Sequence, residues 1–196
     1  MGKLTQKGGR FFMAYKIVLD AGHEGGSAGF DPGAVNGKYK EAVANLAIAK
    51  KVGAKLQAKG YKVKYTRTGD KELTLKERCQ ISNKYDADLF ISIHLNSSSN
   101  SSANGCETLR YPKVGALTKE LANNIQTELV GATGFRNRGV KERGDLYVLK
   151  HTIASAVIVE CCFISNSAEC KKAFNNSWQE KIANAIVKGV MKTLKY

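Results

Sequence analysis

Two histidines each follow a short run of β-branched and apolar residues. Residues 17–19 precede His23 by a few positions, and residues 89–93 lead directly into His94. Such runs are typical of buried strands, and a parallel sheet commonly builds its site at the carboxyl ends of its strands. The chain has only three histidines, so two at equivalent strand ends indicate a shared site. A third apolar run ends in Glu160, and the three side chains together suggest a metal hydrolase.

A catalytic zinc ion typically has three protein ligands and one open position. His23 and His94 offer two imidazoles, so the third ligand is expected to be a nearby carboxylate or histidine. Glu41 is the best candidate, because it begins a predicted helix whose amino end should lie near the carboxyl edge of the sheet. Its alternative role is to complement the helix dipole. Asp20 and Glu24, beside His23, are rival ligands or residues that orient the imidazoles.

A carboxylate at the end of a buried strand is costly unless it is paired or used. Burial would raise the pKa of Glu160 toward the range that suits a general base, which could move a proton from water to a leaving amine. The alternative is a structural salt bridge with Arg67 or Arg143. The third histidine, His151, could line the cleft or lie on the surface.

The composition fits one globular domain with a sizeable core, since the chain has 196 residues of which 43% are hydrophobic. No apolar run approaches the ~20 residues of a membrane span. The formal net charge of +14 favours attraction to a polyanion, although it also fits a merely soluble basic surface. No stretch that interleaves aromatic and basic residues supports nucleic-acid binding. The five cysteines form no regular framework and are expected to be reduced and structural.

Hydrophobic periods alternate between two and 3.6 residues, which is typical of α/β architecture. The predicted strands are Lys16–Asp20, Lys62–Arg67, Asp88–His94, Glu107–Tyr111, Leu146–Leu149 and Ala156–Glu160. The predicted helices run from about Glu41 to Lys59, from Thr74 to about Lys84, from about Gly115 to Leu129, and from Ser177 to near the end of the chain. Two of them open with the Ser/Thr-x-x-Glu pattern of a capping box, and residues 131–144 are predicted to be a polar loop.

The first residues do not have the pattern of a secretory signal. They are basic and glycine-rich, and the apolar stretch at 11–14 is shorter than the about 7–15 residues that a signal peptide needs. We therefore interpret residues 1–14 as an N-terminal extension, either tag-like or natural, and residues 15–196 as the catalytic domain.

Several segments carry a family resemblance in the right order. They are residues 17–25 with 31–34, 40–47, 63–67 with Leu75 and Arg78, 90–96, 138–141, 146–149 and 157–166. With them, the chain resembles the zinc-dependent N-acetylmuramoyl-L-alanine amidases of the type 3 family over about residues 15–194.

This resemblance implies a function and a fold. The implied reaction cleaves the amide between the muramic acid lactyl group and L-alanine in peptidoglycan. The implied fold is a single α/β domain, with a mostly parallel, twisted six-stranded sheet and helices on both faces. Such an enzyme acts at the bacterial cell wall, either as the catalytic domain of a larger autolysin or as a phage-type endolysin released when the membrane fails. Its partners would be peptidoglycan and anionic wall polymers, without nucleic acid.

The resemblance also assigns roles to individual residues. It makes His23, Glu41 and His94 the ligands of one Zn²⁺ and Glu160 the catalytic carboxylate. The candidate substrate-binding residues are Asn96, Arg138 and His151. Two other functions stay open at this point: a zinc peptidase that cuts within the stem peptide, and a non-catalytic module that binds the cell wall.

Overall fold

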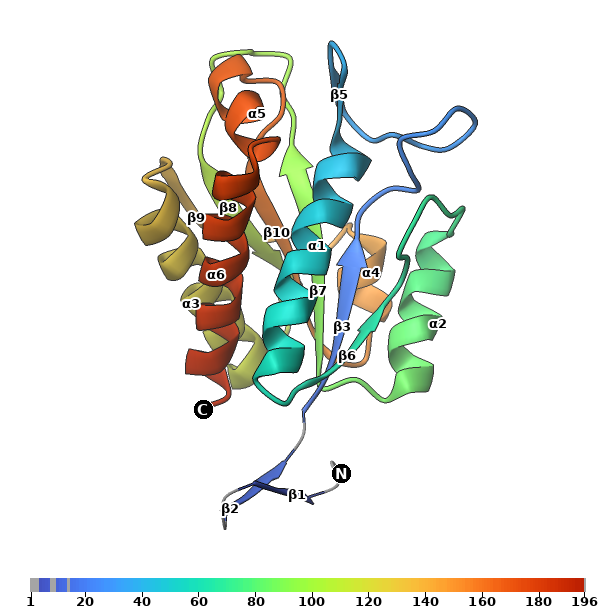
Figure 1. The fold of residues 1–196 in the computed structure, drawn as a ribbon, viewed down its shortest axis with the longest axis vertical. Coiled ribbons are helices and arrows are strands. Elements are labelled where there is room, and N and C mark those ends of the chain that lie inside the picture. Colours follow the sequence, from blue (N-terminus) through green and yellow to red (C-terminus); the bar gives the residue numbers. More distant parts are fainter. Residues whose placement is uncertain (1–3, 8–9, 14, 196) are drawn as a thin grey trace.

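The computed structural model describes residues 4–7, 10–13 and 15–195, and a six-stranded sheet forms its centre (Figure 1). The sheet order is β6-β3-β7-β10-β8-β9. Its strands are β3 (Lys16–Ala21), β6 (Lys62–Tyr65), β7 (Leu89–Asn96), β8 (Cys106–Arg110), β9 (Asn137–Glu142) and β10 (Ser155–Phe163). All neighbours pair in parallel except β8 and β10. The predicted mostly parallel sheet of six strands is therefore confirmed.

Helices cover both faces of this sheet, as the resemblance implied. One face carries α1 (Glu41–Ala58), α3 (Ala116–Thr133), α5 (Ser167–Ala173) and α6 (Asn176–Thr193). The other face carries α2 (Leu75–Tyr85) and the short α4 (Tyr147–His151). Because both faces of β3, β7 and β10 are covered, these strands are apolar almost throughout, as parallel strands usually are. No helix in the described part of the chain has the length and apolar character needed to cross a bilayer.

The period of two along each strand decides which side chains meet at the sheet edge. Val18, Phe90 and Ile158 pack in the smaller core under α2 and α4. Two residues further along their strands, and hence on the same face, stand Asp20, Ser92 and Glu160. His94 lies two positions beyond Ser92 and pairs with Glu160 in the parallel register. The strand pattern therefore places His94 and Glu160, with Asp20 and Ser92, on one face at the carboxyl edge of the sheet.

Two short hairpins lie outside the main sheet. In the first, β1 (Leu4–Lys7) pairs with β2 (Arg10–Met13), and Figure 1 shows it below the domain. The predicted extension over residues 1–14 includes positions 1–3, 8–9 and 14, which lie outside the described residues. In the second, β4 (Val35–Asn36) pairs with β5 (Tyr39–Lys40) directly before α1. This hairpin sets where the first turn of α1 begins.

The prediction was wrong about residues 146–149, which begin the helix α4 rather than forming a strand. A short apolar run fits a strand and a buried helical turn equally well, and here Val148 and Leu149 are buried against the sheet. The predicted loop at 131–144 also contains a strand, β9, which pairs with β8 at the edge of the sheet. The residues of β9 are mostly polar, so they lack the alternation of apolar and polar residues that predicts a strand.

One of the two predicted capping boxes is confirmed. Thr74 accepts a hydrogen bond from the backbone N–H of Glu77, and the carboxylate of Glu77 accepts one from that of Thr74. The second was wrong: Asn175 caps α6 through its side-chain oxygen. Glu180, expected in that box, instead forms ion pairs with Lys51 and Lys55 of α1.

The packing of α6 on α3 gives a stability prediction. A Cβ at Gly189 would lie 2.7 Å from the Cα of Ile125, which is backbone and cannot move aside easily. We expect Gly189→Ala to lower the free energy of unfolding by about 1–3 kcal/mol through overpacking. The control is Gly131→Ala in α3, where a Cβ would meet nothing within 4 Å and better helix propensity should leave stability equal or higher. Urea denaturation measures both, and equal stability of the two variants would contradict this packing.

Candidate metal centre

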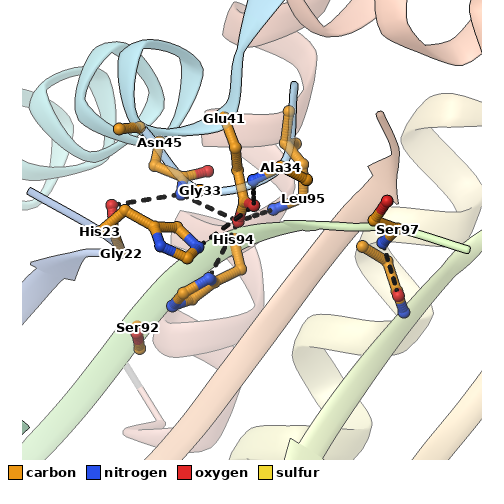
Figure 2. Close-up of polar contacts among 12 residues, drawn as sticks. Gly22, His23, Gly33, Ala34, Glu41, Asn45, Ser92, His94, Leu95 and Ser97 are labelled. Carbon is orange, nitrogen blue, oxygen red and sulfur yellow. Dashed lines mark hydrogen bonds and ion pairs between the residues drawn. The ribbon is translucent and has the colours of Figure 1, made fainter. Parts of the chain in front are cut away.

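Glu41 stands at the centre of the site, between His23, which follows β3, and His94, which lies near the end of β7 (Figure 2). Its Oε2 lies 3.2 Å from Nε2 of His23, and its Oε1 lies 3.0 Å from Nδ1 of His94. The backbone N–H groups of Ala34 and Leu95 each donate to this carboxylate at 3.0 Å. Burial alone would raise the pKa of Glu41, but the hydrogen bonds and charge of the histidines hold it well below its usual range. The carboxylate is therefore ionised and fixed in place.

His23 is held in an unusual conformation by its neighbours. Its φ of 63° lies in the left-handed region, which costs energy for a residue other than glycine. Arg78 stabilises this turn, since its Nη2 donates to the carbonyl oxygen of His23 at 2.6 Å. Oδ2 of Asp31 lies 2.8 Å from Nδ1 of His23, so the other ring nitrogen points to Glu41. Burial lowers the pKa of His23, but Glu41 and Asp31 outweigh it and raise the pKa to about 9.

Two glycines allow the backbone to approach the imidazole rings. A Cβ on Gly22 would lie 2.2 Å from the ring of His94. A Cβ on Gly33 would lie 2.5 Å from the ring of His23 and 2.8 Å from Oε2 of Glu41, and Gly33 also has a φ of 67°. Side chains at either position would therefore collide with the cluster.

The three side chains fit a divalent metal ion. One ligand atom from each of His23, Glu41 and His94 can be chosen so that all three lie within 4.8 Å of one another. Two imidazole nitrogens and one carboxylate oxygen form a donor set that is typical of catalytic zinc. The contact of Asp31 with His23 is the outer carboxylate that usually fixes the ring orientation of a metal-binding histidine. The geometry therefore supports the predicted set, and it favours Glu41 over Asp20 and Glu24.

Asp20 and Glu24, the rival ligands, have other partners. Asp20 is buried and forms an ion pair with Arg78 at 2.7 Å, and it also accepts hydrogen bonds from Thr66 and Ser92. Burial would raise the pKa of Asp20, but Arg78 and these hydrogen bonds lower it. Glu24 accepts a hydrogen bond from the backbone N–H of Asp31. Both carboxylates thus support the loop that carries His23.

Glu160 lies beside this cluster and lacks a partner of its own. It pairs with His94 of β7 on one side and with Glu107 of β8 on the other. Its Oε2 is buried and has no hydrogen-bond partner among the described residues. Burial, with the charges of Glu41 and Glu107, raises the pKa of Glu160 to about 7, while His94 partly opposes the shift. A carboxyl group in this state can accept and return a proton near neutral pH.

Glu160 does not form a structural salt bridge with Arg67 or Arg143, because both arginines have other partners. Arg67 donates to the carbonyl oxygens of Ala21, Gly22 and Ala42 beneath the loop that carries His23. Arg143 pairs with Asp145 on the surface.

Glu107 is a buried carboxylate whose role was not predicted from the sequence. Its Oε2 binds Nε of Arg138 at 2.8 Å and Nζ of Lys141 at 2.7 Å, and its Oε1 accepts a hydrogen bond from Asn96. Burial would raise its pKa, but Lys141 and Arg138 lower it. The only signal in the sequence was a glutamate inside a predicted strand, and its partners come from segments up to 34 positions away.

The candidate substrate-binding residues lie in two places. Asn96 and Arg138 both contact Glu107, one strand away from Glu160. His151 ends α4 and is exposed, with its ring centroid 4.2 Å from that of Tyr147. A cavity of about 430 Å³ opens beside the metal cluster on the side of α2 and α4. Its lining includes His23, His94, Leu73, Leu75, Leu146 and Tyr147.

An α/β domain with histidines and carboxylates gathered at strand ends has the arrangement of a metal hydrolase. The chain belongs to the N-acetylmuramoyl-L-alanine amidase family, whose sequence model matches residues 17–192. This confirms the resemblance seen in the sequence and the class of enzyme, a hydrolase that acts on peptidoglycan.

Individual relatives agree with this assignment. The chain is 39% identical over 175 residues to the uncharacterized protein YqiI of Bacillus subtilis, covering 89% of this chain and 82% of that protein. It is 37% identical over 176 residues to the N-acetylmuramoyl-L-alanine amidase LytC of the same organism, covering 89% of this chain but 34% of LytC. The crystal structure of an N-acetylmuramoyl-L-alanine amidase from Clostridium difficile 630 matches with a TM-score of 0.87 at 34% identity, covering 93% of this chain and 97% of that one.

The buried ion pair of Asp20 and Arg78, beneath the loop that carries His23, gives a prediction about stability. Asp20→Asn should lower the free energy of unfolding by about 3 kcal/mol, because it leaves the buried Arg78 without a carboxylate. Since the pKa of Asp20 is lower in the folded state, its contribution is present above about pH 4 and is lost as the pH falls through the lowered value. The variant should therefore lose less stability on acidification than the wild type.

Denaturation by urea between pH 3 and pH 7 measures this effect. The matched control is Asp86→Asn, because Asp86 is exposed and its pair with Lys16 lies on the surface. A control as unstable as Asp20→Asn would show that the buried pair has no special role.

Proposed function

We propose that this chain is a zinc-dependent N-acetylmuramoyl-L-alanine amidase with a single metal ion. His23, Glu41 and His94 would hold the ion, and Glu160 would be the catalytic carboxylate. The observation that carries the proposal is the buried, unpartnered Oε2 of Glu160 beside the His23–Glu41–His94 cluster. A carboxyl group is rarely left without a partner in a protein interior unless it has a function there.

The chemistry can be divided between the ion and the chain. When bound, zinc supplies Lewis-acid chemistry, which polarises a carbonyl group and lowers the pKa of water. Glu160 would take a proton as the amide is attacked and would then deliver it to the nitrogen of the leaving L-alanine. Its pKa of about 7 suits both steps. Asp31 would keep His23 oriented, and Glu41 would keep the two histidines together.

The substrate and its place follow from the family. We propose that the enzyme cleaves the bond between the muramic acid lactyl group and L-alanine, and thus acts at the bacterial cell wall. The net charge of +14 would concentrate the enzyme on a wall that carries anionic polymers. Nucleic acid has no role in this proposal.

Metal content tests the ligand set. Wild-type protein should retain one zinc ion per chain after dialysis, and added zinc should raise its Tm, because a ligand that binds only the folded state stabilises it. His94→Ala should lose most of the bound zinc and the shift in Tm. His151→Ala is the control and should keep both. Elemental analysis with thermal unfolding measures them, and full zinc content in His94→Ala would refute the ligand assignment.

The role of Glu160 requires a separate experiment. Glu160→Gln should reduce kcat by about 10²–10⁴-fold, the usual contribution of a general acid or base, while zinc content stays at the wild-type level. Release of stem peptides from purified peptidoglycan is the assay. Glu142→Gln is the matched control, since Glu142 is exposed and pairs with Arg110 at a distance from the cluster. Near-normal release by Glu160→Gln would end this mechanism.

The same digest separates the remaining functions. An amidase exposes new amino groups on L-alanine only, whereas a peptidase acting within the stem exposes them on other residues. Mass spectrometry of the products distinguishes the two. A pure binding module would release nothing, and its binding to the wall would not respond to chelation of zinc.

A further inference from the structure

Two carboxylates that lie side by side in the sheet have very different surroundings. Glu160 and Glu107 are cross-strand neighbours in β10 and β8, but both available cations bind Glu107. Arg138 and Lys141 contact the same oxygen, Oε2, at 2.8 and 2.7 Å. One carboxylate needs only one cation for charge balance, so this cluster carries an excess positive charge next to the proposed catalytic residue.

The two cations are also free to make further bonds. Their side chains keep 26% and 43% of their exposure, whereas Glu107 keeps 9%. The guanidinium of Arg138 lies over the ring of Phe163, 4.8 Å from its centroid, and Nη1 reaches the carbonyl oxygen of Asn104 at 3.4 Å. Its Nη2 has no partner among the residues that the structure describes. A fixed, planar guanidinium with an unused N–H group is well suited to a second carboxylate.

We propose that Arg138 and Lys141 bind a carboxylate of the substrate on the peptide side of the scissile bond. The inference rests on the proposed amidase function and deepens it. The ligand is the free carboxylate of the acidic residue that follows L-alanine in the stem peptide. Glu107 is the positioning residue, because it holds both cations toward the sheet edge.

The distances are compatible with this assignment. Neighbouring strands lie about 4.8 Å apart, so β9 is roughly 10 Å from Glu160 across β8. The carboxylate of the residue after L-alanine lies about two residue lengths, roughly 7 Å, from the scissile nitrogen in an extended peptide. The long side chains of Arg138 and Lys141 can bridge the difference. The muramic acid side would then extend the other way, toward the cavity near α2 and α4.

Two soluble substrates test the proposal. One is N-acetylmuramoyl-L-alanyl-D-glutamate with its γ-carboxyl blocked as an N-methylamide and its α-carboxylate free, and the other is the same compound with a carboxamide in place of the α-carboxylate. Wild-type enzyme should prefer the carboxylate by at least about tenfold in kcat/KM, since a charge-assisted hydrogen bond is lost in the carboxamide. In Arg138→Gln and Lys141→Gln the ratio of the two kcat/KM values should fall toward one.

Lys119→Gln is the matched control, because it removes the same charge from an exposed position in α3 and should keep the wild-type ratio. Thermal unfolding confirms that each variant is folded. A wild-type ratio near one would overturn the subsite, as would variants that lose activity on both substrates in equal proportion. If wild-type enzyme cleaves neither substrate nor purified peptidoglycan, the proposed function fails, and the subsite fails with it.

Discussion

The cluster of His23, Glu41 and His94 depends on a buried ion pair that does not belong to it. Asp20 and Arg78 meet under the carboxyl end of β3 at 2.7 Å, and Arg78 continues to the carbonyl oxygens of Ala21 and His23. Between these two, the carbonyl oxygen of Gly22 accepts a hydrogen bond from Arg67. Two guanidinium groups thus replace the hydrogen bonds that the strand loses where it ends. These bonds help to hold His23 in its left-handed backbone conformation, with its ring toward Glu41.

A second constraint is the distribution of charge across the sheet. His94, Glu160 and Glu107 form a row over three adjacent strands. If a cation bound Glu160, the pKa of that carboxyl group would fall and the group would stay ionised near neutral pH. In this sheet, Arg138 and Lys141 form their ion pairs with Glu107 instead. The negative charge of Glu107 then also helps to raise the pKa of Glu160. Neutralising one neighbour and leaving the other unpaired is how the fold makes two glutamates differ.

The sequence could predict those features that follow from periodicity. Strand ends are visible as apolar runs, so the order of residues alone places His94 and Glu160 at one edge of the sheet. Asp31 and Glu107 could not be found in this way, because their roles depend on which loops meet in space. The strand β9 escaped for a related reason: it lies at the edge and alternates weakly. The apolar run in α4 was wrongly predicted to be a strand, because a buried helical turn and a short strand can have the same composition.

Two glycines beside the histidines restrict the space around the cluster. Gly22 and Gly33 bring the backbone against the rings of His94 and His23, so the loop closes the cluster on the side of α1. The ring of His94 and the side chain of Glu160 face the opposite side of the sheet, where the cavity beside α2 and α4 opens. In the proposed reaction, the scissile amide would therefore reach the cluster from this side, where the cavity lies.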